Sequence, residues 1–119
     1  MYGSYLKPVL TMRPKFRYRV MATPPRFPAD LYLVDWLHAK RFEADFITDH
    51  DLNAEGPELL RHYNVVVSSS HHEYWTGSML DSLETYLDEG GRFMYLSGNG
   101  LYGVASVDRL QDAICEAHD

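Results

Sequence analysis

The run Asn64-Val65-Val66-Val67-Ser68 constrains the fold of this chain more than any other feature. A strand with one face in water alternates apolar and polar residues, whereas a strand covered on both faces, as in a parallel sheet, is continuously apolar. Three consecutive β-branched residues between polar neighbours therefore predict a strand of a parallel sheet that is buried on both faces.

Predicted helices and strands alternate along the rest of the chain. Helices are predicted over residues 28–40, 56–62, 76–89 and 107–117, and strands over residues 44–48, 64–68 and 92–96. Thr76 is a suitable N-cap for the third helix, and Gly90-Gly91 can end it because glycine tolerates the left-handed C-cap conformation. This order predicts an α/β fold with a parallel, doubly wound sheet flanked by helices. Three strands leave a sheet edge bare, so we expect a portion of a larger domain or a chain that packs on a partner.

The first 28 residues differ in composition from the rest. They contain six of the eleven Lys and Arg residues, no acid and five of the six prolines. This composition predicts an extended basic segment ahead of an α/β domain at residues 29–119. Lys15–Val20 alternates basic with aromatic or apolar residues and is a candidate fourth strand. Such a strand could touch RNA, but a solvated edge strand is the favoured interpretation.

Charge, hydropathy and cysteine content indicate which classes of protein this chain does not resemble. Eleven bases against seventeen acids give a net charge of −6, which disfavours binding to nucleic-acid phosphates. No apolar run approaches the roughly 20 residues that a membrane-spanning helix needs. Cys115 is the single cysteine and cannot form an internal disulfide, which suits a reducing cytoplasmic location.

Polar residues gather where the predicted strands end. In open parallel sheets ligands bind outside the carboxyl ends of the strands, where the loops Thr48–Asn53, Ser68–Trp75 and Ser97–Tyr102 are expected. Ser68–Trp75 is the richest loop, with three hydroxyls, two imidazoles, a carboxylate, a phenol and an indole within eight residues. We favour a functional site there. The same residues also have a structural interpretation, with serines and histidines bonded to loop backbone and aromatic rings capping the core.

Several known catalytic motifs are missing from these loops. The cysteine lies away from any predicted strand end, no Gly-x-Ser-x-Gly elbow occurs, and Ser97–Gly100 lacks the lysine of a phosphate-binding loop. His71-x-Glu73 also occurs in zinc deaminases, but the accompanying Pro-Cys-x-x-Cys is absent. Asp49–Asp51 resembles a metal cluster, although a turn and cap explain it better. What remains is hard-ligand metal chemistry or acid–base chemistry by Glu73 and His71.

Nearly the whole chain, about residues 5–108, carries three distinctive segments in order: PVLTMRPKFR, RFPADLYLVDWLHAKRFEADFITDHDL and HHEYWTGSMLDSLETYLDEGGRFMYLSGNGLYGVASVD. Their combination resembles the C-terminal region of the large (β) subunit of N,N-dimethylformamidase and its relatives. The resemblance implies a flavodoxin-like α/β sandwich of the class I glutamine-amidotransferase type, which agrees with the predicted alternation of elements.

The resemblance also implies a metal site. The family holds a mononuclear ferric iron, Fe(III), with two tyrosines and one glutamate, and that glutamate corresponds to Glu73 of HHEYW. A histidine near the metal corresponds to His71, and an asparagine of the family's GGNG-type loop corresponds to Asn99 of SGNG. Ferric iron prefers anionic oxygen donors and can polarise an amide carbonyl. His71 would then handle protons, and Asn99 would hydrogen-bond the substrate or the developing oxyanion.

This chain departs from the family pattern in several respects. Both iron-binding tyrosines should lie upstream of the matched stretch and a further acidic residue downstream, so none of the nine tyrosines is assigned as a ligand. His72 stands where relatives commonly have proline, and Ser97 replaces a common glycine. We therefore expect a central part of a much larger subunit, inactive by itself because one protein ligand cannot hold ferric iron tightly.

Three hypotheses of function follow. The first is that the parent protein hydrolyses a small N-substituted amide of the formamide type, with the remainder of the subunit or a second copy as the partner of this chain. The alternative is a non-catalytic amidotransferase-like module that binds a partner or a small ligand. The third is a sugar-processing relative of the same fold, because such proteins also carry histidine and aromatic residues after a valine strand.

Overall fold

The computed structural model describes residues 2–4, 27–107 and 114–118, with side chains over residues 27–105. The elements in chain order are β1 (Tyr2–Ser4), α1 (Phe27–Ala39), α2 (Asp49–Glu55), α3 (Pro57–Leu60), β2 (Val65–Ser70), β3 (Tyr74–Thr76), α4 (Gly77–Asp88), β4 (Arg92–Ser97), β5 (Gly103–Val107) and β6 (Ile114–His118). No helix among the described residues is both long and apolar enough to cross a membrane.

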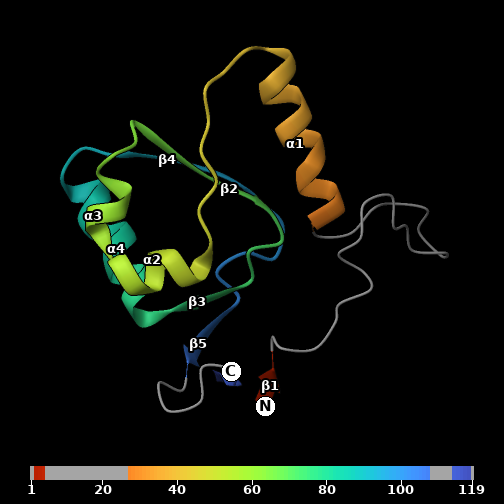
Figure 1. Ribbon diagram of the computed structural model, residues 1–119. Helices are drawn as coiled ribbons and strands as arrows, with labels where there is room; N and C mark the ends of the chain where they lie inside the picture. The colour runs from red at the N-terminus through yellow and green to blue at the C-terminus, as the bar shows by residue number, and fades with distance from the viewer. Residues whose placement is uncertain (1, 5–26, 108–113, 119) are drawn as a thin grey trace, which may run out of the picture.

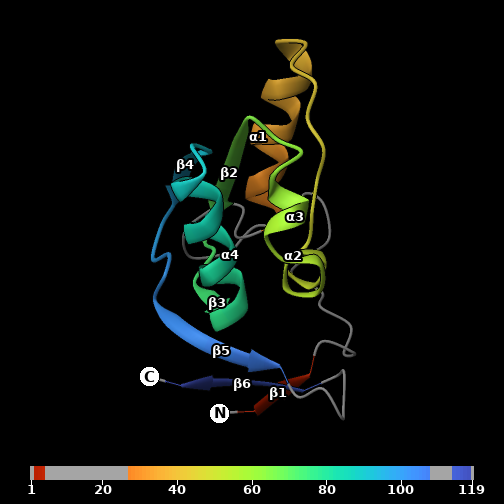
Figure 2. The same ribbon diagram turned by 90° about the vertical axis from the view of Figure 1, so that its left-hand side faces the viewer.

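The strands form two small sheets. β2 and β4 are parallel, in register from Val65 opposite Arg92 to Ser70 opposite Ser97, and α4 lies in the connection between them (Figure 1). The second sheet has the order β1-β6-β5-β3, in which β3 and β5 are parallel and the other neighbours antiparallel. It lies at the opposite end of the molecule from α1 (Figure 2). The prediction of a mixed helix and strand domain with parallel strand pairs is therefore confirmed.

One hydrophobic core lies between α4, the short helices α2 and α3, and one face of the β2–β4 sheet (Figure 1). Its buried members are Leu52, Leu60, Trp75, Met79, Leu83 and Tyr86. Val66 and Phe93 pack against them from the two strands. Each fully buried apolar side chain of this size contributes about 1.5–3 kcal/mol relative to exposure. This packing fixes α4 against the sheet and sets the direction in which the chain leaves β2.

The ends of α4 follow the sequence prediction. Thr76 caps its N-terminus, because the Thr76 Oγ1 accepts a hydrogen bond from the Met79 N–H at 3.2 Å. The helix ends at Asp88, and Gly90 follows with a φ of 92°, in the left-handed region that favours glycine. The short helix predicted near Pro57 is present as α3.

Two predicted elements are wrong. Residues 44–48 do not form a strand, because β2 pairs with β4 alone among the described strands, so no neighbour supplies the hydrogen bonds of a ladder. The helix predicted over residues 107–117 is replaced at Ile114–His118 by β6, which pairs with β1 and β5. Non-local pairing here overrides a local helical pattern. The candidate strand Lys15–Val20 lies outside the described residues.

The prediction that the valine strand is buried on both faces is also wrong. Val65 and Val67 keep 42% and 40% of their surface exposed, whereas Val66 packs against the core. Successive side chains of a strand point to opposite faces, and α2, α3 and α4 pack against only one of them. On the other face α1 lies against the carboxyl end of β2, where Asp30 interacts with Ser69, so that face is open around Val65 and Val67.

Gly91 provides a test of how tightly the end of α4 packs. It lies against the buried ring of Tyr86, whose hydroxyl donates to the Tyr63 carbonyl at 3.0 Å. A Cβ at Gly91 would overlap that ring. We predict that Gly91→Ala lowers the free energy of unfolding by about 1–3 kcal/mol, as overpacking does.

Gly77→Ala is the matched control for this substitution, because nothing lies within 4 Å of the Cβ it would add. Urea unfolding followed by tryptophan fluorescence measures both variants. Equal stability of the two would contradict the close packing of Gly91 on Tyr86.

Candidate functional site

The carboxyl ends of β2 and β4 bring two loops together. The Gly98 N–H donates to the Ser70 carbonyl at 2.7 Å, so the chain leaving β4 begins against the end of β2. Farther along, the N–H groups of Tyr102 and Gly103 donate to the Glu73 carbonyl at 2.8 and 3.2 Å. The loops predicted to meet at this edge therefore do meet, and backbone hydrogen bonds join them.

His71, Glu73 and Asn99 all lie in this pair of loops. The His71 imidazole lies against Gly98, with Nε2 3.3 Å from the position a Cβ would occupy there. Asn99 follows with a φ of 50°, a left-handed conformation that asparagine tolerates better than most residues. The Glu73 side chain is partly buried, and its carboxylate makes none of the hydrogen bonds that join the loops. Glycine at position 98 thus lets an imidazole approach the loop that carries Asn99.

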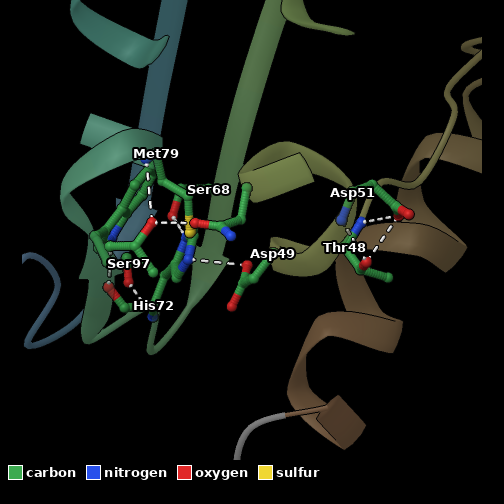
Figure 3. Close-up of polar contacts among 10 residues, drawn as sticks. Thr48, Asp49, Asp51, Ser68, His72, Met79 and Ser97 are labelled. Atoms are coloured by element: carbon green, nitrogen blue, oxygen red, sulfur yellow. Dashed lines mark hydrogen bonds and ion pairs between the residues drawn. The ribbon is translucent and has the colours of Figure 1, made fainter. Parts of the chain in front are cut away.

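His72 is held by side chains from three directions (Figure 3). Its Nδ1 lies 3.2 Å from the Ser68 Oγ, and its Nε2 lies 3.1 Å from Asp49 Oδ1 at the start of α2. Its ring stacks on Trp75 with the centroids 4.0 Å apart. These contacts are with side chains and not with backbone carbonyls, the partners considered in the alternative structural interpretation. They connect the loop after β2 to α2, the third predicted part of the site.

His72 and Ser97, the two positions where the resemblance predicts proline and glycine, contact each other. The His72 N–H donates to the Ser97 Oγ at 2.8 Å (Figure 3). A proline at position 72 has no N–H to donate, and a glycine at position 97 has no side chain to accept. Because a partly buried N–H needs an acceptor, Ser97 supplies what His72 requires. The loop entering Glu73 therefore accommodates both departures at once.

The Asp49–Asp51 stretch is the N-terminus of α2. The Thr48 Oγ1 accepts from the Asp51 N–H at 3.2 Å, and Asp51 Oδ2 accepts from the Thr48 N–H at 2.9 Å. The Thr48 hydroxyl also donates to Asp51 Oδ2 at 2.7 Å, and this bond, followed by the one from the Thr48 N–H, lowers the pKa of Asp51. The favoured turn is therefore wrong, because these residues form the first turn of a helix, whereas the cap considered with it is present at Thr48.

Asp30, in the first turn of α1, is a member of this region that the sequence prediction missed. Burial raises the pKa of Asp30, while a hydrogen bond from the Ser69 hydroxyl and the nearby His71 and His72 act to lower it. The sequence Pro28-Ala29-Asp30 indicates the start of a helix and nothing more. No local pattern could show that this carboxylate faces the end of β2, because the two segments are far apart in the chain.

Glu73 does not by itself complete a metal site. Over the part of the chain that the structure describes, no group of three or more His, Cys, Asp or Glu side chains is arranged to hold a metal ion. A ferric ion needs several anionic oxygen donors.

Comparison with known proteins identifies the family. A family described as "N,N-dimethylformamidase beta subunit-like, C-terminal" matches residues 1–116. The chain belongs to this family. It is 48% identical over 106 residues to the N,N-dimethylformamidase beta subunit of Paracoccus aminophilus, and 47% identical over 106 residues to that of an Alcaligenes species. Each match covers 89% of this chain and 14% of the relative, so this member of the N,N-dimethylformamidase beta subunit family spans about one seventh of the length of these relatives.

The contact between His72 and Ser97 predicts an energetic coupling. In the native background, Ser97→Ala leaves the His72 N–H without its acceptor and should lower the free energy of unfolding by about 1–3 kcal/mol. In a His72→Pro background no N–H is present, so the same substitution should cost less than about 0.5 kcal/mol. Chemical denaturation of the four proteins in a double-mutant cycle measures the difference. If the changes in the free energy of unfolding for the His72 and Ser97 substitutions simply add, the two residues are not coupled.

Proposed function

We propose that this chain is the Glu73-bearing part of an amide hydrolase that acts on small N-substituted amides of the formamide type. Membership of a family whose named relatives are N,N-dimethylformamidase beta subunits supports a hydrolase. The observation that carries the proposal is the position of His71 against Gly98, beside Asn99, on the backbone-bonded loops that also hold Glu73. All three residues therefore lie in loops at the carboxyl ends of β2 and β4, the position at which open parallel sheets bind ligands.

Each of the three residues has a chemical role in this proposal. Glu73 is one oxygen donor to a ferric iron, which when bound would polarise the substrate carbonyl and activate water. His71 handles a proton at its imidazole, and Asn99 donates its side-chain N–H to the carbonyl oxygen as negative charge develops there. The remaining donors lie outside the described residues, in a longer subunit or in a second copy of the chain.

We also propose that the complete domain has a flavodoxin-like fold. The parallel β2–β4 pair and the ligand edge at its carboxyl ends support a flavodoxin-like sheet of the glutamine-amidotransferase type. The exposed Val65 and Val67 support a further layer over the open face, because parallel sheets are normally covered on both sides. A single cysteine, in a chain that cannot form an internal disulfide, supports a reducing cytoplasmic setting.

A non-catalytic binding module is the second candidate function. It is favoured by one observation, that the described residues contain no cluster of three or more His, Cys, Asp or Glu side chains suited to a metal. A module of this kind would use the same loops to hold a partner or a small ligand without turning it over. The two functions differ in what they require of Glu73.

We predict that the 119-residue chain, purified from iron-replete cells, retains far less than one iron per chain and releases no formate from N,N-dimethylformamide. The reason is that a single carboxylate donor gives too little affinity for a ferric ion. Iron analysis, a visible absorption spectrum and a formate assay make the measurement. Stoichiometric iron with a phenolate-to-iron absorption band would show instead that tyrosines of this chain complete the site.

Substitution of Glu73 separates the enzyme from the module. In a full-length subunit carrying this segment, Glu73→Gln should remove iron binding and hydrolysis together, because an amide is a far weaker donor to ferric iron than a carboxylate. Glu84→Gln, at an exposed position of α4, is the matched control and should leave both unchanged. Retention of iron and activity by the Glu73 variant would refute the proposed ligand.

A further inference from the structure

Asp30 occupies a place in the fold that the proposed roles do not explain. An acidic residue in the first turn of a helix ordinarily interacts with the helix N-terminus. Asp30 instead takes a hydrogen bond from the Ser69 hydroxyl, at the carboxyl end of β2. It therefore joins α1 to the strand end that carries His71 and Glu73.

Three buried polar atoms near this junction lack a hydrogen-bond partner within the described ranges: Asp30 Oδ1, the Ser70 Oγ and His72 Nε2. His72 Nε2 lies 3.1 Å from the Asp49 carboxylate, which leaves Asp30 Oδ1 and the Ser70 Oγ to be explained. Native proteins pair most of their buried polar atoms, and an unpaired carboxylate oxygen is among the costliest exceptions. Ser70 also has a φ of 59°, which is unfavourable for a residue other than glycine. Unpaired acceptors and a strained backbone at one strand end are what a ligand-binding position shows before its ligand is present.

The chain supplies little positive charge to this carboxylate. In the described part of the chain, the charges that act on Asp30 come from His71 and His72 rather than from lysine or arginine. His72 is already engaged by Asp49 and Ser68. Burial consequently outweighs these influences, and the pKa of Asp30 is raised. A cation with N–H donors would satisfy both the charge and the free oxygen.

We propose that Asp30, held by Ser69, forms a subsite for a small protonated amine at the carboxyl end of β2. The class of ligand rests on the proposed function, since hydrolysis of an N-substituted amide by one water gives a carboxylate and an amine that takes up a proton as an ammonium ion. The ammonium N–H donates to Asp30 Oδ1 in a charge-assisted hydrogen bond. Asp30 is thus the residue that receives the amine half of the molecule, close to His71.

Titration of the 119-residue chain with dimethylammonium chloride, followed by backbone amide NMR, tests the subsite directly. A parallel titration with sodium chloride corrects for ionic strength. We expect saturable shifts at the amides of Asp30 and of Ser69–His71. Asp30→Asn should weaken binding roughly tenfold, since it removes the charge from the acceptor. Asp35→Asn, an exposed acid on the same helix, is the matched control and should bind as the native chain does.

Several results would overturn the subsite. They are an absence of saturable shifts, equal binding by the Asp30→Asn chain, and equal binding of tetramethylammonium, which carries the charge but has no N–H. If Asp30→Asn does not fold, Ser69→Ala keeps the carboxylate and should still weaken binding severalfold by releasing it. Glu73→Gln should leave amine binding unchanged. If Glu73→Gln removes iron from the full-length subunit but the chain binds no amine, the subsite alone is rejected. If the chain binds the amine but Glu73→Gln leaves iron and hydrolysis of the full-length subunit unchanged, the proposed function alone is rejected.

Discussion

Parallel pairing of β2 with β4 is the constraint on which the rest of the structure depends. Two parallel strands leave their sheet at the same edge, so the segments that follow them are brought together however far apart they lie in the sequence. α4 makes this possible, because its Thr76 cap and its buried Met79 and Leu83 hold it against one face of the sheet. The hydrogen bond from Gly98 to Ser70 then joins the two loops where the strands end.

The adjacent histidines of this edge have different surroundings. His72 is fixed by Ser68, Asp49 and the ring of Trp75, and its backbone N–H is bound by Ser97. His71 is exposed and lies on Gly98, next to Asn99. One histidine therefore secures the loop, and the other remains accessible to a ligand. The His72 N–H also connects the loop to β4 through the Ser97 Oγ.

Family membership identifies which protein family this segment belongs to, whereas the local geometry shows how a few of its residues are arranged. The family relationship covers 89% of this chain but only 14% of each named relative, so it identifies the segment rather than a complete catalytic apparatus. The geometry identifies an edge with His71, Glu73 and Asn99 on it and Asp30 arriving from α1. The exposed Val65 and Val67 form an apolar surface suited to contact with more protein.

The sequence by itself determined the local features: α1, the capped α4, the valine strand, its parallel partner, and the polar loops at their carboxyl ends. Caps, glycine stops and β-branched runs act over a few residues, and their physical effects can be read from those residues alone. Only the tertiary structure decided that residues 44–48 lack a strand partner among the described strands, that residues 114–118 pair as a strand, and that Val65 and Val67 of β2 stay exposed. It also decided that Asp30 faces Ser69 and that His72 binds Ser97 and Asp49. These outcomes depend on contacts between distant segments, which no local pattern of residue types encodes.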